Sequence, residues 1–165
     1  MKKRIGYLLV IAITVMVGFS HYSCNNTDKD VNTDELLTYC SKQVSKTLFQ
    51  IQNDSSKLPR SIEKHGQKWS MIDASDWTSG FWPGILWYTY EFTRDDFIKS
   101  KAEQYTQYLT TLLDPDHSGD HDLGFQFLCS FGNAYRLTNN EHYKKIMLDG
   151  ASKLALFYNP KAGTM

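Results

Sequence analysis

The sequence has no net charge, few cysteines and no hydrophobic run long enough to cross a membrane comfortably, and each absence excludes a class of protein. Its 165 residues carry 18 Lys and Arg against 18 Asp and Glu. We therefore expect no nucleic-acid partner, because that binding depends on an excess of positive charge. Three cysteines make no disulfide framework, and we expect Cys40 and Cys129 to be buried free thiols.

The first 23 residues are typical of a bacterial export signal. Three basic residues at 2–4 precede an uncharged stretch over 5–19, which has the length of a signal-peptide core and is short for a membrane span. Cys24 then follows in a context that resembles the lipidation site of bacterial lipoproteins, although His21 stands where an aliphatic residue is usual. Simple cleavage or an uncleaved anchor is the alternative to lipidation.

This pattern predicts three parts of the chain: a signal peptide of the lipoprotein type over 1–23, an acidic polar leader over 24–33, and a folded domain over 34–165. In either case the protein is expected to leave the cytoplasm of a bacterium. It would then reside in the periplasm or be anchored to the membrane through a lipid on Cys24.

The rest of the chain predicts an all-α fold, because apolar residues recur at helical spacing and no alternation typical of strands competes with it. Residues 53–75 lack periodicity and predict a long loop, with a short extended piece at 70–72 as a possibility. Amphipathic helices are predicted over 34–51, 95–113 and 141–157. Two more apolar helices, over 81–92 and 122–137, leave almost no polar face, so we expect other helices to surround them.

Buried and surface helices thus alternate with a period of about 45 residues. Gly80-Phe81 aligns with Gly124-Phe125 at an offset of 44, and Thr93 with Thr138 at an offset of 45. This period is typical of helical hairpins that assemble as an open solenoid or as a closed ring, and inner helices so rich in aromatic residues favour the ring. Two and a half hairpins would not complete a ring, so we expect the chain to be part of a larger fold.

A polar segment over residues 114–122 contains four carboxylates and two imidazoles, directly before the second apolar helix. Its register resembles an EF-hand loop, but Phe125 stands where the bidentate Glu is required. His117 and His121 lie in a turn from which no common zinc site can be predicted. We therefore predict no metal and no cofactor, and the simplest interpretation of this segment is a helix-capping loop.

All four tryptophans lie within residues 69–87. Trp82 and Trp87 fall inside the first apolar helix and are expected in the core, whereas Trp77 precedes that helix. Asp122 holds the same position 45 residues later, so parallel helices would bring the indole and the carboxylate together. Asp122 can be either a helix cap or a functional carboxylate. An indole beside an acid at the open end of a helical barrel suits a sugar ring.

Two motifs carry a family resemblance: Trp77-Thr78-x-Gly80-Phe81-Trp82-Pro83-Gly84-x-Leu86-Trp87, and then His121-Asp122-Leu123-Gly124-Phe125. Together they resemble glycoside hydrolase family 88, the unsaturated glucuronyl hydrolases, whose fold is an (α/α)6 barrel. The resemblance covers residues 34–165, the first part of such a barrel. It implies a hydrolase, a glycosidase of polysaccharide degradation, with Asp122 as a catalytic residue and Trp77, His121 and Asp122 in the substrate site.

The reaction implied by the resemblance removes a 4,5-unsaturated uronic acid from the non-reducing end of acidic oligosaccharides, such as glycosaminoglycan fragments left by lyases. It proceeds by hydration of the ring double bond. The second catalytic aspartate of the family belongs to later hairpins, and no residue here matches its motif, so these 165 residues alone are expected to be inactive. The alternatives are an unsaturated rhamnogalacturonyl hydrolase, a class that we expect to lack the Asp of the second motif, and a non-catalytic surface glycan-binding protein.

Overall fold

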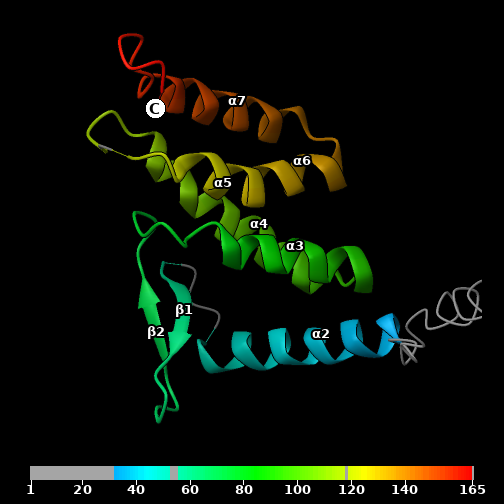
Figure 1. Ribbon diagram of the computed structural model, residues 1–165. Helices are drawn as coiled ribbons and strands as arrows, with labels where there is room; N and C mark the ends of the chain where they lie inside the picture. The colour runs from blue at the N-terminus through cyan, green and yellow to red at the C-terminus, as the bar shows by residue number, and fades with distance from the viewer. Residues whose placement is uncertain (1–31, 53–55, 118, 165) are drawn as a thin grey trace, which may run out of the picture. The chain divides into compact units, whose positions relative to one another are not determined.

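The computed structural model describes residues 32–52, 56–117 and 119–164. The signal peptide over 1–23 and Cys24 lie outside these residues. In the described part of the chain, no helix combines the length and the apolar character that a membrane span needs. The elements, shown in Figure 1, are α2 (Thr33–Gln50), β1 (Leu58–Ile62), β2 (Trp69–Ile72), α3 (Phe81–Thr93), α4 (Asp96–Tyr108), η1 (Leu109–Leu113), α5 (Leu123–Phe127), η2 (Leu128–Gly132), α6 (Asn133–Thr138) and α7 (Glu141–Ala155).

The predicted helical hairpins are confirmed, and the two hairpins turn in the same way. α3 ends at Arg94 in the left-handed conformation, after which the Asp95 carboxylate accepts hydrogen bonds from the first backbone amides of α4. Forty-five residues later, α6 ends at left-handed Asn139 and the Asn140 side chain caps α7. A left-handed residue followed by a capping side chain makes a tight reversal between helices. The repeat is therefore present in the turns as well as in the helices.

Helix α3 and the helical segment formed by α5, η2 and α6 run parallel to each other, as Figure 1 shows. Gly84 lies against Cys129, and Glu91 binds Arg136, so each contact joins residues 45 apart. Arg136 donates two hydrogen bonds to the Glu91 carboxylate, at 2.6 and 2.7 Å. The Arg136 guanidinium thereby holds the pKa of the Glu91 carboxyl below its ordinary value. The offset of 45 residues is thus the same at both of these points of contact between the two helices.

The hairpins bury a common aromatic core. Trp87, Tyr105, Phe127 and Phe131 are almost fully buried, and Trp82 is nearly so. The Trp87 indole donates a buried hydrogen bond of 2.8 Å to Thr106 Oγ1, which joins α3 to α4. A buried indole N–H needs such a partner, since leaving it unpaired costs free energy. The predicted core positions of Trp82 and Trp87 are confirmed.

Three details of the secondary structure differ from the sequence-based expectation. The region predicted as a loop over 53–75, with an extended piece at 70–72, contains an antiparallel hairpin, in which Leu58 pairs with Ile72 and Ile62 with Trp69. The predicted helix over 122–137 contains the π-helical turn η2, where the Ser130 and Asn133 side chains donate to backbone carbonyls. The predicted helix over 95–113 tightens into the 3₁₀-helix η1. Local hydrogen-bonding side chains favour such departures, and apolar periodicity does not detect them.

Two expectations about burial are wrong. Cys40 is exposed and Cys129 is half-buried, so the two free thiols are not core residues, although burial raises the pKa of Cys129. Helix α3 is not surrounded within the described residues. It packs against α4 on one side and against the α5–α6 segment on another. One apolar stripe of α3 remains exposed, and it consists of Phe81, Ile85, Tyr88 and Phe92.

Gly80 allows the closest approach between the two parallel helices. A Cβ atom at this position would lie 2.5 Å from the Gln126 Cα and 2.6 Å from its carbonyl oxygen. Real Cβ atoms do not approach backbone so closely, and backbone atoms cannot move aside as a flexible side chain can. Glycine is therefore required here for its lack of a side chain.

We expect Gly80→Ala to destabilise the fold by about 1–3 kcal/mol, the usual cost of overpacking a tight contact. The free energy of unfolding in urea, followed by circular dichroism, measures this loss. Gly66→Ala is the matched control, because a Cβ there would meet its nearest neighbours at 3.4 Å, in the hairpin turn. Equal stability of the two variants would contradict the proposed role of Gly80.

Candidate functional site

The loop before α3 is organised by the Asp76 carboxylate. One oxygen, Oδ1, accepts hydrogen bonds from the Thr78 backbone amide at 2.9 Å and from its hydroxyl at 2.6 Å. The other oxygen, Oδ2, lies 2.8 Å from Arg60 Nη1 on strand β1. An aspartate that binds backbone two residues later fixes a tight turn. This turn sets the direction in which Trp77 leaves the backbone.

Gln126 ties this loop to the next helical segment. The residue is 4% exposed, and its Nε2 donates to the Asp76 carbonyl at 2.9 Å and to Ser79 Oγ at 3.0 Å. Gln126 lies in α5, four residues after Asp122, while Asp76 immediately precedes Trp77. One buried amide therefore holds the two segments that carry the predicted site residues in a fixed register.

The aromatic side chains of Trp77, Phe81 and Phe125 form a cluster, here called the aromatic triad. Phe81 and Phe125 stack with their ring centroids 5.4 Å apart and their planes 5° apart, and Trp77 meets both rings edge-on at about 6 Å. Trp77 remains 46% exposed. The Arg60 guanidinium lies 6.0 Å from the centroid of the Trp77 ring. An exposed, oriented indole with a cation beside it can contact the C–H face of a sugar.

Asp122 stands at the start of α5, but its side chain makes no capping hydrogen bond. Its side chain is 20% exposed, and Oδ1 lies 3.4 Å from Nε2 of His121, a side chain that is 80% exposed. The Asp122 backbone amide donates to the Asp120 carboxylate at 2.8 Å. Asp120 therefore supplies a local hydrogen bond to the turn, and the Asp122 carboxylate is left for other chemistry.

Helix α7 holds the loop that leads to Asp122. Lys153 donates from Nζ to the carbonyls of Leu112 and Asp114, at 2.9 and 2.7 Å, at the point where η1 ends. Gly119 adopts a positive φ of 58°, and the ring of Phe157 lies against it. Helix termini expose carbonyls without partners, and a lysine ammonium satisfies them well. The outer helix thus positions the polar loop.

A small hollow separates the two loops. Its volume is about 150 Å³, and it is lined by Ser75, His117, Gly119, Asp120 and Gln126. That volume is below the roughly 300 Å³ at which ligand pockets begin. Neither Trp77 nor Asp122 lines this hollow. The structure brings the segments of Trp77 and Asp122 together. A sugar-sized cavity shared by these two side chains stays a prediction.

Asp120, His121 and Asp122 offer three ligand atoms that lie within 4.8 Å of one another. All three come from consecutive residues of one turn, and the Asp120 carboxylate also accepts the Asp122 amide. Exposed acidic groups of this kind are common where no ion binds. The absence of a metal and of any cofactor stays a prediction.

Comparisons with known proteins identify related enzymes. No protein-family model matches the chain. It is 29% identical over 170 residues to an unsaturated glucuronyl hydrolase of Formosa agariphila, an alignment that covers 96% of this chain and 40% of that protein. It is 30% identical over 133 residues to an unsaturated chondroitin disaccharide hydrolase of Streptococcus pyogenes serotype M1, covering 78% and 32%.

Among solved structures, the chain resembles an unsaturated glucuronyl hydrolase specific for heparin. The TM-score is 0.65 at 35% identity, over 78% of this chain and 34% of that one. The chain is a partial homologue of the unsaturated glucuronyl hydrolases. It spans between about a third and two fifths of the length of these relatives. Its helical hairpins correspond to part of their α/α barrel.

The motif that resembles unsaturated glucuronyl hydrolases did not reveal three residues of the candidate site: Gln126, Asp76 and Arg60. The pair Asp76 and Thr78 follows the spacing of an aspartate turn, which local sequence rules detect. The 45-residue repeat places Gln126 opposite Phe81, close to the loop, but no periodicity identifies a buried amide as a link between loops. Arg60 reaches the site from a strand that the sequence did not predict.

Gln126→Leu is expected to cost about 1–3 kcal/mol of stability, because the Asp76 carbonyl and the Ser79 hydroxyl lose their buried donor. Urea unfolding measures this cost. Gln107→Leu, at an exposed position of α4, is the matched control and should change stability by less than about 0.5 kcal/mol. An unchanged midpoint for the Gln126 variant would mean that this amide does not hold the two segments together.

Proposed function

We propose that the protein containing this sequence is a glycoside hydrolase that removes a 4,5-unsaturated uronic acid from the non-reducing end of acidic oligosaccharides. The observation that carries the proposal is the Asp122 carboxylate, which caps no helix and stands at the start of a helix whose Phe125 belongs to the aromatic triad. The homology to unsaturated glucuronyl hydrolases supports the same assignment.

The reaction requires proton transfer and therefore an ionisable side chain. The π bond between C4 and C5 breaks as a general acid gives a proton to C4, and a water molecule adds to C5 and gives up one of its protons to a general base. The hemiketal formed at C5 then opens, and the glycosidic oxygen departs with a proton. Carboxyl groups perform such general acid and base steps. We assign Asp122 to one of these carboxyl functions and assign the second to a part of the protein outside these residues, so the 165 residues alone should be inactive.

Substrate contact is assigned to Trp77 and His121 beside Asp122. The exposed indole of Trp77 offers a flat apolar surface for the C–H face of a pyranose. His121 is highly exposed and lies against the Asp122 carboxylate, where a ring nitrogen can hydrogen-bond a sugar hydroxyl. Arg60 lies beside the Trp77 ring and is paired with Asp76, so its remaining N–H groups could donate to an oxygen of a bound sugar.

The substrate class follows from the relatives. One is named for unsaturated chondroitin disaccharide and another as specific for heparin. Both glycans carry uronic acids, so we propose fragments of glycosaminoglycans as substrates. Export by the segment over 1–23, with lipidation of Cys24, is part of the same proposal.

Asp122→Asn in the whole protein should lower turnover by about 10²–10⁴-fold, the usual contribution of an acid–base group. The loss of the ultraviolet absorbance of the conjugated double bond of an unsaturated chondroitin disaccharide measures turnover. The fold should persist, because the Asp122 side chain makes no capping bond.

Asp116→Asn is the matched control, since this exposed acid lies in the same loop and should retain full activity. Retained turnover in the Asp122 variant would refute the catalytic assignment. If the wild-type whole protein bound these disaccharides without consuming the double bond, the glycan-binding alternative would replace it. Consumption of unsaturated rhamnogalacturonan fragments in preference would favour the rhamnogalacturonyl alternative.

A further inference from the structure

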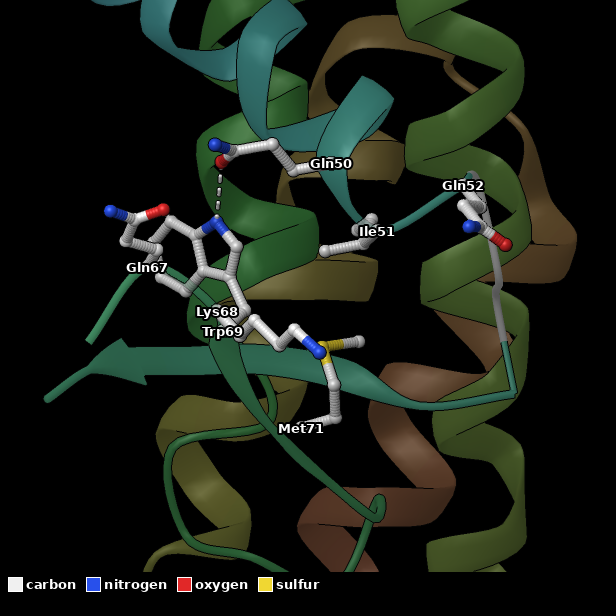
Figure 2. A pocket seen from close by; sticks show the side chains of 7 residues that line it. All are labelled: Gln50, Ile51, Gln52, Gln67, Lys68, Trp69 and Met71. Carbon is white, nitrogen blue, oxygen red and sulfur yellow. Dashed lines mark hydrogen bonds between the residues drawn. The ribbon is translucent and has the colours of Figure 1, made fainter.

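A second pocket lies where the end of α2 meets strand β2, and none of its lining residues belongs to the candidate site. Its volume is about 390 Å³, within the range of small-ligand pockets. Figure 2 shows its lining, which consists of Gln50, Ile51, Gln52, Gln67, Lys68, Trp69 and Met71. These residues come from the last turn of α2, the residues after it, the hairpin turn and β2.

The indole of Trp69 is held in a fixed orientation in this pocket. Its Nε1 donates to Gln50 Oε1 at 3.2 Å, the bond drawn as a dashed line in Figure 2. Part of the ring packs against the core, and part contributes to the pocket. An indole fixed in this way loses little entropy when a ligand stacks on it, and its apolar surface matches the C–H face of a pyranose.

The polar groups of the pocket are suited to a hydroxylated anion. Lys68 supplies one ammonium, and the lining contains no carboxylate. Within the described residues, the side chains of Gln52, Gln67 and Lys68 have no hydrogen-bond or ion-pair partner. Primary amides both donate and accept, as sugar hydroxyls require, and an ammonium donates to a carboxylate. Lys68 would repel a cationic ligand.

We propose that this pocket is a second, non-catalytic binding site for an acidic sugar, in which a pyranose stacks on Trp69 and its carboxylate binds Lys68. The pocket contains no acid–base pair, so it binds the sugar without cleaving it. In an enzyme of acidic glycans, such a site would retain the oligosaccharide on the protein. The inference goes beyond the proposed hydrolase function and does not depend on it, because it rests on the lining residues alone.

Nuclear magnetic resonance titration with sodium glucuronate tests the proposal. The reporter is the indole N–H signal of Trp69, assigned by its absence from the spectrum of Trp69→Phe. We expect a saturable shift of this signal in the wild type and in Asp122→Asn. Lys68→Met should weaken binding by about tenfold or more, the usual effect of losing one charge-assisted hydrogen bond.

Lys64→Met is the matched control, because this exposed lysine lies on the same hairpin outside the pocket, and its variant should bind glucuronate as the wild type does. Glucose, which lacks the carboxylate, should bind at least about tenfold more weakly than glucuronate. The proposal is overturned by a Trp69 signal that does not move, by equal effects of the two lysine variants, or by equal affinity for glucose. Glucuronate has no ring double bond, so none of these outcomes bears on the hydrolysis by Asp122.

Discussion

The close contact between the N-terminal ends of α3 and α5 is the constraint on which the rest of the candidate site depends. Gly80 removes the side chain that would keep the two backbones apart, and Gln126 uses the resulting proximity to bind the loop before α3. With a side chain at position 80, the Gln126 side-chain amide could not reach the Asp76 carbonyl. Without the hydrogen bonds of Gln126, the loop carrying Trp77 would depend on surface contacts such as that between Arg60 and Asp76. Such contacts contribute little to stability individually.

The part of the fold that could be predicted from the sequence is the part that follows a period. Helical spacing identified every hairpin helix, and the offset of 45 residues between Thr93 and Thr138 anticipated the parallel register that Glu91 and Arg136 confirm. The π-turn at 128–132 and the strands at 58–62 and 69–72 depend on individual hydrogen bonds and strand pairing. No periodic pattern records such interactions, so the sequence indicated the extended piece at 70–72 but neither its pairing with 58–62 nor the π-turn.

The candidate site shows the same division. The motif identified Trp77, His121 and Asp122, and the structure places their segments side by side through Gln126 and Phe125. What the motif could not give is the geometry between them, because the shape of a cavity depends on everything that borders it. The exposed apolar stripe from Phe81 to Phe92 has the character of a surface that further protein covers. Relatives that are about two and a half times as long have additional chain with which to form a complete barrel.

The β-hairpin connects the two regions to which we assign sugar contacts. Arg60 projects from β1 to Asp76 and the Trp77 ring, whereas Trp69 begins β2 and lines the pocket beside α2. Trp69 pairs with Ile62 across the hairpin, whereas Arg60 lies at an irregularity of the pairing, between Pro59 and Ser61. Trp77 itself lies in the loop that follows β2 and leads into α3. A single acidic chain of suitable length could then contact both regions, which would raise its overall affinity above that of either region alone.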